Sequence, residues 1–335
     1  MLDAKPSDNN DPDSGKNRPK DEAHANEIKE YILSRARNKK PWILGTLTAN
    51  VAKEKIELIK LCREFCLVVI EENVKLDITD GQHRQSAIKK LMDSSESYLI
   101  ANHKFPITLV LEGDDRQCQT DFRDMAQTKP LDKSLLLSFG EFEGRVGITK
   151  NLVEKVAMFH RKTEKIKGTA STQKKLIFTM NYIAKFVGCA LANDPQNELK
   201  KYDVETCSNS LISSLNNFFD QCELTSNIAT KSVEDLTVDE VAEFKENSIL
   251  GKSVGLEVLG RVMYLAKDYE NHNFSSDKIS QIAQLDWSMS SELWQGNIVK
   301  KDPNPSNPNK LYKITAGASP IKMAVYTAKS QLGWQ

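Results

Sequence analysis

A strand-to-helix junction around residue 80 constrains this chain more than any other feature of its sequence. Residues 67–79 are rich in apolar and β-branched side chains, which favours a strand, and residues 85–92 have the apolar spacing of a helix. Between them lies the pentapeptide Asp80-Gly81-Gln82-His83-Arg84. The first amide groups of a helix have no partner within it, and the helix dipole favours negative charge beside them. The junction therefore predicts a site for an anion.

The side chains of the pentapeptide suit such a site. Gly81 permits a tight turn or the close approach of a ligand, and Arg84 offers two parallel hydrogen bonds to a phosphate. His83 carries or accepts a proton near neutral pH. Asp80 has three open roles: to orient His83, to cap the helix, or to hold a water or metal ion. We therefore expect Gly81, Gln82 and Arg84 to bind phosphate, with Asp80 and His83 as catalytic residues if the protein hydrolyses a nucleotide.

The simpler interpretation is an Asp-Gly turn followed by an ordinary helix start, since Asp-Gly is a common turn pair. His and Arg directly after the glycine favour the functional interpretation. The sequence contains no Gly-x-x-x-x-Gly-Lys-Ser/Thr pattern, so the expected phosphate site is not of the Walker type.

Length and composition limit the classes to which this protein can belong. The chain has 335 residues, which suits two domains, and its formal net charge is zero because 46 basic residues balance 46 acidic ones. Proteins that coat DNA are usually basic overall, so this class is disfavoured, whereas a local basic face stays open. The sequence has no apolar run of signal-peptide type and no window long enough to span a membrane. We expect a cytoplasmic protein that makes no membrane contact.

The pattern along the chain divides it into three parts. Residues 1–20 are polar and rich in Asp, Asn, Ser and Pro, which predicts a flexible tail. Residues 21–145 mix strand-like and helix-like segments, and residues 146–335 are mainly helical in pattern. The expected fold class is therefore α+β, with a mixed α/β domain followed by a mainly helical domain.

In the first domain, the segments 67–71 and 74–78 are expected to pair around a turn at Glu72-Asn73. The order of segments places the pentapeptide near the end of a strand at 105–111, at an edge where α/β sites commonly collect. Four basic residues follow that strand: Arg116, Arg123, Lys129 and Lys133. They are expected either to line the phosphate pocket or to lie on solvated helix faces. The further expected elements are helices at 22–40 and 56–65 and a strand at 42–51.

The second domain is expected to contain helices at 152–159, 176–191, 211–219, 238–244, 255–269 and 278–285, with a proline-broken loop at 300–310. The most apolar of these segments, 176–191, is broken by polar residues and is interpreted as a core helix. None of the six cysteines has zinc-ligand spacing, so no metal site is expected. Cys62 and Cys66 would share one face of the 56–65 helix as buried thiols.

Two further sets of residues have competing interpretations. The densest basic cluster falls in residues 160–175, where Arg161, Lys165, Lys167 and Lys174 either contact DNA phosphates or belong to a solvated linker. Trp287 and Trp294 either stack on bases or pack in the core, and their spacing favours the core.

The pentapeptide matches the signature of the DGQHR-domain proteins, and the chain resembles the DndB group of that family, which is tied to bacterial DNA phosphorothioate (sulfur) modification. Residues 29–48, residues 121–139, and Gln284-Leu-Asp-Trp287 with Trp294 are similar to other family segments. The second of these usually carries an Asn where this chain has Ala126 or Gln127. The resemblance implies DNA and other modification proteins as partners, and a role in repressing the modification genes.

The resemblance also implies a first domain related to ParB and sulfiredoxin, where a Gly-x-x-Arg turn at a helix start holds nucleotide phosphates. Gln82 stands where sulfiredoxin has a cysteine, which argues against sulfiredoxin-type sulfur chemistry in this turn. Fold likeness alone does not establish function.

Two functional hypotheses follow. In the first, which we favour, the chain is a DNA-directed regulatory or accessory protein of the modification system. In the second, it is a nucleotide hydrolase stimulated by DNA, which would bind ATP or another nucleotide with magnesium and place Asp80 and His83 beside the reacting phosphate. The oligomeric state stays open, including a homo-oligomer.

Overall fold

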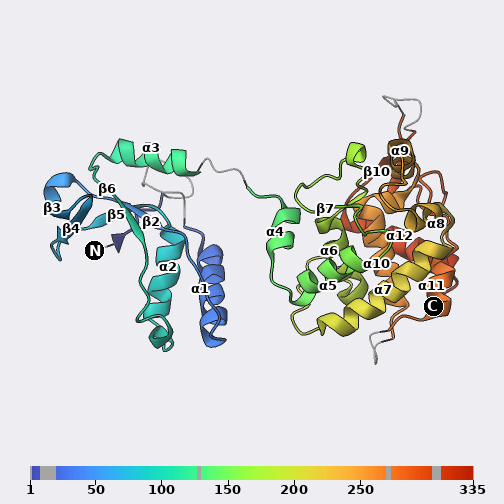
Figure 1. The fold of residues 1–335 in the computed structure, drawn as a ribbon, viewed down its shortest axis with the longest axis horizontal. Helices are drawn as coiled ribbons and strands as arrows, with labels where there is room; N and C mark the ends of the chain where they lie inside the picture. The colour runs from blue at the N-terminus through green and yellow to red at the C-terminus, as the bar shows by residue number, and fades with distance from the viewer. Residues whose placement is uncertain (1, 8–19, 127–129, 269–272, 304–310, 335) are drawn as a thin grey trace. The chain divides into compact units, whose positions relative to one another are not determined.

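The computed structural model describes residues 2–7, 20–126, 130–268, 273–303 and 311–334. The chain divides into two compact units, Met1–Lys129 and Pro130–Gln335 (Figure 1). The first unit combines strands with helices and the second is mainly helical, which confirms the expected α+β class.

The first unit is built on a sheet with strand order β1-β5-β2-β6. β5 pairs in parallel with β1 and antiparallel with β2, and β2 pairs in parallel with β6. α1 packs against α2 around buried Ile32, Leu33, Leu91 and Ile100, and α3 crosses the sheet and contacts β5 (Figure 1). The elements are β1 (Leu2–Asp3), α1 (Glu22–Arg37), β2 (Leu47–Asn50), β3 (Ile56–Cys62), β4 (Phe65–Ile70), β5 (Leu76–Asp80), α2 (Gln82–Met92), β6 (Ile107–Val110) and α3 (Asp115–Ala126).

The predicted helix at 56–65 is wrong, because Ile56–Cys62 is strand β3 and forms a hairpin with β4. β4 therefore pairs with the strand before it, and the expected pairing of 67–71 with 74–78 is wrong as well. A short apolar run fits both a strand and a helix by periodicity, and the pairing partner decides between them. Cys62 and Cys66 are consequently exposed on the hairpin, not buried in a helix.

Two further expectations need adjustment. The sequence predicts a flexible tail over residues 1–20, yet Leu2–Asp3 forms the edge strand β1 along β5, and residues 8–19 lie outside the described residues. The strand expected at 105–111 is present as β6, but Asp80 lies opposite Thr48, which pairs with Thr108 near the start of β6. The chain that follows β6 therefore leaves from the opposite end of the sheet, and α3 leads back across it.

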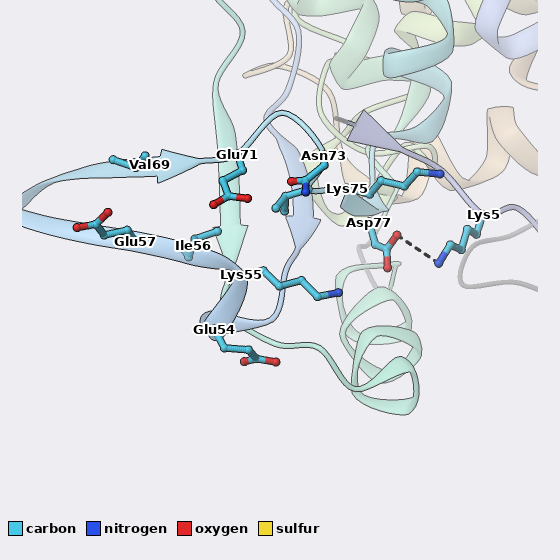
Figure 2. Close-up of a pocket in the computed structure, with 11 residues that line it drawn as sticks. Lys5, Glu54, Lys55, Ile56, Glu57, Val69, Glu71, Asn73, Lys75 and Asp77 are labelled. Carbon is cyan, nitrogen blue, oxygen red and sulfur yellow. Dashed lines mark ion pairs between the residues drawn. The ribbon is translucent and has the colours of Figure 1, made fainter.

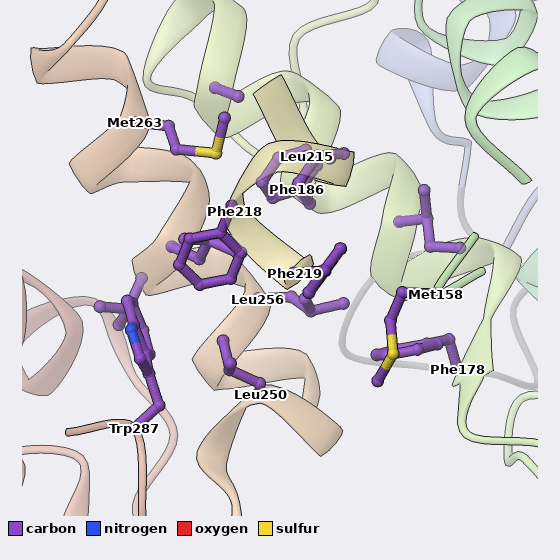
Figure 3. Close-up of a cluster of buried hydrophobic side chains, with 14 of the residues drawn as sticks. Met158, Phe178, Phe186, Leu215, Phe218, Phe219, Leu250, Leu256, Met263 and Trp287 are labelled. Atoms are coloured by element: carbon purple, nitrogen blue, oxygen red, sulfur yellow. The ribbon is translucent and has the colours of Figure 1, made fainter. Parts of the chain in front are cut away.

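The second unit encloses one large hydrophobic core, in which Phe186, Phe218 and Trp287 meet between the helices (Figure 3). Trp287 and Trp294 have no exposed surface and their ring centroids are 5.0 Å apart, which confirms the core interpretation of both. The elements of the second unit are α4 (Lys133–Phe139), α5 (Gly144–Lys155), β7 (Thr163–Glu164), β8 (Phe178–Thr179), α6 (Met180–Ala192), α7 (Val204–Gln221), α8 (Glu223–Thr230), α9 (Val238–Asn247), α10 (Ser253–Leu265), α11 (Ser276–Ala283), β9 (Val299–Lys301), β10 (Tyr312–Ile314) and α12 (Ala318–Gln331).

Side-chain caps explain where several of these helices begin. Asp203, Thr237 and Ser275 each accept a hydrogen bond from a backbone N–H in the first turn of the helix that follows. Thr237 and Glu240 form a reciprocal capping box at the start of α9. The helices expected at 176–191, 211–219, 238–244, 255–269 and 278–285 correspond to α6, α7, α9, α10 and α11, while the one expected at 152–159 ends at Lys155.

The segment expected as a loop at 300–310 begins within β9, which pairs with β10; residues 304–310 lie outside the described residues. Among the residues that the structure describes, no helix combines the length and the apolar character needed to cross a membrane.

Candidate functional site

The site is centred on the turn between β5 and α2. Gly81 caps the start of α2 with φ +95°, in the left-handed region that favours glycine. A Cβ atom at this position would lie 2.6 Å from Cδ2 of Leu47. Because glycine has no side chain to accept from the first amides of α2, the helix start is left without a side-chain cap. The local sequence thus produces the expected turn and the expected helix start.

Arg84 lies across this turn. Its Nη2 donates to Oδ2 of Asp80, one helical turn earlier. A Cβ atom on Gly45 would lie 2.6 Å from Nη1, and one on Gly81 would lie 3.0 Å from Nε. The guanidinium therefore occupies space that two glycines leave open. Its Nε is buried and makes no hydrogen bond, so a donor remains in place beside the helix start.

His83 is 5% exposed and faces α1. Its Nε2 accepts from the backbone N–H of Asp21 at 3.0 Å, which requires a lone pair on Nε2. Asp21 caps α1 by accepting from the N–H of His24, and this hydrogen bond is the main reason that the pKa of Asp21 lies below its usual value. His24 also stacks edge-on against His83 with ring centroids 5.3 Å apart. His83 thus links the starts of α1 and α2.

Orienting His83 is one of the three roles left open for Asp80, and the contacts of both side chains bear on it. The structure places Asp80 against Arg84 and His83 against Asp21. Both side chains of the expected catalytic pair are therefore engaged by other groups.

A pocket of about 570 Å³ opens over this turn. Six of its lining residues come from the end of β5 and the start of α2, and we call them the floor. The other lining residues come from three other segments and are mostly apolar, and we call them the walls. The lining residues are Thr79, Asp80, Gly81, Gln82, His83 and Arg84 in the floor, and His24, Ile28, Ile43, Leu44, Gly45, Phe122 and Met125 in the walls. A lining that joins polar groups at a helix start to apolar side chains suits a ligand that combines an anionic group with a less polar part.

A buried polar network positions α3 over the sheet and thereby places Phe122 and Met125. Oγ1 of Thr79 donates to Oδ1 of Asn50, and Nδ2 of Asn50 contacts Oδ2 of Asp121 at 3.4 Å. Asn50 and Thr79 are each 2% exposed. Sequence reasoning missed these wall and network residues, because their proximity depends on strand register. The sequence similarity over residues 121–139 was the one signal that pointed to α3.

None of the described basic residues that were expected after β6 lines the pocket. Arg123 is 66% exposed and pairs with its neighbour Asp124 at 2.9 Å. Arg123, Arg116 and Lys133 do not line the pocket, and Lys129 lies outside the described residues. The geometry therefore brings Gly81, Gln82 and Arg84 together without Arg123.

The residues expected to contact DNA belong to the second unit. Arg161 pairs with Glu234 at 2.6 Å, and Lys165 pairs with Glu154 at 2.7 Å. Lys167 and Lys174 are exposed and form no ion pair among the described residues. Half of the expected basic face is thus neutralised by neighbouring glutamates.

Within the described ranges, no group of three or more His, Cys, Asp or Glu side chains is arranged to hold a metal ion.

Comparison with known proteins identifies the family. The model of the DndB family, described as DNA-sulfur modification-associated, matches residues 1–335. No curated protein and no solved structure matches the chain. The chain belongs to the DndB family, and this membership associates it with DNA sulfur modification, that is, phosphorothioation.

Proposed function

We propose that the protein is a DNA-directed regulatory or accessory component of phosphorothioate modification, and that its pocket binds a phosphate of a nucleotide or of DNA. The observation that carries this proposal is the placement of the Arg84 guanidinium at the uncapped start of α2, inside a pocket with apolar walls. A positive helix end and a guanidinium fork together form a site for a phosphate.

The ion pair with Asp80 sets how a phosphate would enter. Asp80 satisfies one edge of the guanidinium, so an incoming dianion must share Arg84 with a carboxylate. The uncapped start of α2 offers a positive helix end that does not depend on releasing Asp80. Repulsion by Asp80 should make the site selective for ligands that also use the apolar walls, as a nucleotide does.

The surroundings of His83 support binding over hydrolysis. A general base needs an accessible lone pair within reach of the attacking water. The imidazole is 5% exposed and its Nε2 accepts from Asp21, while Asp80 is paired with Arg84. A hydrolase would have to rearrange both groups before it could activate water. We therefore place transcriptional regulation of the modification genes ahead of nucleotide hydrolysis.

We further propose that the first unit follows the ParB and sulfiredoxin plan. The support is local: a strand, a left-handed glycine as helix cap, and an arginine three residues later that bends back over that glycine.

The test compares Arg84→Ala with Arg123→Ala, which removes an exposed arginine of the same unit from outside the pocket. Calorimetric titration with ATP and magnesium, and separately with duplex DNA, should give weaker binding for Arg84→Ala by about 1.5 to 3 kcal/mol, the range for hydrogen bonds to charged groups. Arg123→Ala should bind both ligands as the unmodified protein does. If Arg84→Ala and the unmodified protein bind both ligands with equal affinity, the pocket does not bind either ligand through Arg84, and the proposal is wrong.

Phosphate release on the same preparations separates regulation from hydrolysis. Under our proposal, the unmodified protein releases no phosphate from ATP with or without DNA. Turnover that disappears in His83→Ala, while nucleotide affinity stays within a few-fold, would establish the hydrolase instead.

A further inference from the structure

An aromatic stack lies at the edge of the sheet where β2 and β6 begin. The ring of His103 stacks on that of Trp42, with centroids 4.7 Å apart and planes inclined by 27°, and the ring of Phe105 lies 6.0 Å from that of Trp42. β2 and β6 pair in parallel, and the N–H of Leu47 donates to the carbonyl of Pro106 at 3.1 Å, so the segments that precede the two strands lie side by side. We call Trp42, His103 and Phe105 the aromatic platform.

The aromatic platform is anchored on one side and open on the other. Trp42 is half-buried and packs against the small core that α1 and α2 share. His103 is exposed, although Trp42 covers one face of its ring. The second face of the imidazole is therefore available to another flat group, which would extend the stack outward.

The surroundings of the aromatic platform are basic. Residues 38–53 and 97–111, which include all three rings, contain no Asp or Glu. Lys39 and Lys104 lie in these two segments, are exposed, and form no ion pair among the described residues. Unpaired lysines beside exposed aromatic rings attract phosphates while the rings offer a surface to bases.

The two acidic residues that border the second segment do not oppose this charge. Glu96 precedes the segment and is held by Arg37 through two hydrogen bonds of 2.7 and 2.6 Å. Glu112 follows β6 and so belongs to the opposite end of the sheet.

A pocket of about 730 Å³ at the base of the β3–β4 hairpin has the opposite character (Figure 2). Its lining carries four carboxylates and three lysines. Two of these lysines are already paired, Lys5 with Asp77 at 3.4 Å and Lys75 with Asp3 at 3.3 Å. Three glutamates and one lysine remain, so this pocket disfavours a phosphate chain. Lys75 therefore provides a control for the charges of the aromatic platform within the same unit.

We propose that the aromatic platform binds single-stranded DNA, with an unpaired base stacked on the open face of His103 and neighbouring phosphates bound by Lys39 and Lys104. Proteins that hold single strands combine aromatic rings for the bases with cations for the backbone. In a duplex the bases are paired and stacked on each other, so they do not reach an exposed ring. The aromatic platform thus distinguishes single-stranded from double-stranded DNA.

The aromatic platform leads into the pocket of Arg84. The three residues that follow Trp42 all line that pocket. Three residues span at most about 11 Å, and a Cβ atom on the third of them, Gly45, would lie 2.6 Å from Nη1 of Arg84. A strand whose base stacks on His103 can therefore extend a later phosphate to Arg84. The choice of DNA as the partner, and this extension, rest on the proposed function.

The first test removes the outer ring of the stack. Fluorescence anisotropy at low salt should show tighter binding of a labelled oligothymidylate of about 12 nucleotides than of the corresponding duplex. His103→Ala should weaken binding of the single strand about fivefold, the lower end for a base stacked on an aromatic side chain. His103→Phe keeps a flat ring and should bind within about twofold of the unmodified protein. Circular dichroism checks that both variants are folded. Equal binding of the single strand by His103→Ala and the unmodified protein contradicts the proposal.

The second test concerns the two lysines. Affinity for single strands falls with salt with a slope of about −0.7 for each neutralised phosphate. Lys39→Ala with Lys104→Ala should therefore reduce the slope by about 1.4. Lys75→Ala removes a lysine that is paired with Asp3 in the other pocket, and should leave the slope unchanged. An equal reduction by Lys75→Ala would mean that the overall charge of the unit, and not the aromatic platform, attracts the strand.

Arg84→Ala separates this inference from the proposed function. If Arg84→Ala loses nucleotide binding while His103→Ala binds single strands normally, the aromatic platform is refuted and the proposed pocket stands. If Arg84→Ala binds nucleotide and duplex DNA normally while His103→Ala loses affinity for single strands, the pocket is refuted and the aromatic platform stands. An unmodified protein that does not bind the single strand at low salt would overturn the proposal and leave the aromatic platform to a protein partner.

Discussion

The two units of this protein use their apolar residues in different ways. The second unit buries Phe159, Phe186, Phe218, Trp287 and Trp294 in one continuous core. The first unit divides its buried residues between two small clusters and leaves the β3–β4 hairpin exposed. A unit with little buried apolar surface has less free energy to hold it rigid, but it retains surfaces for ligands and partners.

The polar groups follow the same division. In the second unit three partly or fully buried lysines donate to backbone carbonyls: Lys162 to Ile228 at 2.8 Å, Lys245 to Ala170 at 2.8 Å and Lys267 to Leu191 at 2.9 Å. In the first unit Arg84 keeps a buried donor without a hydrogen bond, in a pocket. These three lysines of the second unit thus serve its structure, whereas our proposal assigns Arg84 of the first unit to a ligand.

The largest expected effect tests the core of the second unit. Trp287 is fully buried, stacks near Trp294 and donates from Nε1 to the carbonyl of Ile282 at 3.0 Å. Trp287→Ala should lower the free energy of unfolding by about 3 to 5 kcal/mol, as for other large-to-small changes in cores. Denaturant titration measures the loss. The control is Tyr326→Ala on α12, where the side chain is 67% exposed and the change should be small.

Nucleotide binding by the Trp287→Ala protein sharpens the comparison. If the units are energetically independent, the first unit should still bind nucleotide at denaturant concentrations that have unfolded the second unit. Loss of nucleotide binding and unfolding of the second unit in one transition would show that the units unfold together.

The next effect concerns pH. Burial lowers the pKa of Lys162 to about 8, below its ordinary value of 10.5. Between these values the unfolded chain holds a proton that the folded protein has released, so stability rises with pH over this window. Relative to Lys162→Met, the unmodified protein should gain up to about 3 kcal/mol from pH 8 to pH 10.5. The matched control is Lys167→Met, which removes an exposed lysine of the same unit that forms no ion pair among the described residues, and it should leave the pH profile unchanged. An equal profile for Lys162→Met and the unmodified protein would contradict the burial.

The features that sequence reasoning predicted are local. The turn at Gly81, the helix that follows, and the capped helices of the second unit depend on residues a few positions apart, so their patterns are visible in the sequence. Trp287 and Trp294 were also assigned correctly, because large apolar side chains in a long helical region have few places except a core.

The features that it missed depend on contacts between distant residues. Ile56–Cys62 has a pattern compatible with a helix, and only its pairing with β4 makes it a strand. Gly45 and Phe122 reach the pocket through strand register and the return of α3, which no spacing near Asp80 reveals. Asp80 and His83 were predicted as neighbours in a chemical pair because they are close in sequence, yet each is engaged by another residue.

The third prediction separates the two glycines at the pocket. Gly81→Ala forces an alanine into the left-handed region and against Leu47, which should cost about 1 to 2 kcal/mol of stability. Gly45→Ala meets only the end of the Arg84 side chain, which can move aside. It should leave thermal stability nearly unchanged while weakening phosphate binding about tenfold, the loss of about one charged hydrogen bond. Normal binding by Gly45→Ala would show that the position of Arg84 is unimportant.

The smallest expected effect tests whether the second unit contributes to DNA binding at all. Affinity for DNA falls with salt in proportion to the phosphates that are neutralised, with a slope of about −0.9 for each phosphate in a plot of log K against log salt. Lys167→Ala with Lys174→Ala should reduce the slope by about 1.8, because each lysine contributes a free charge. Arg161→Ala with Lys165→Ala should reduce it less, since Glu234 and Glu154 already neutralise these side chains. Both effects should be the same for every DNA sequence, because phosphate contacts do not distinguish bases. Unchanged slopes in both double variants would exclude these four residues from DNA contact, and the charges of residues 160–175 would then serve as a solvated linker.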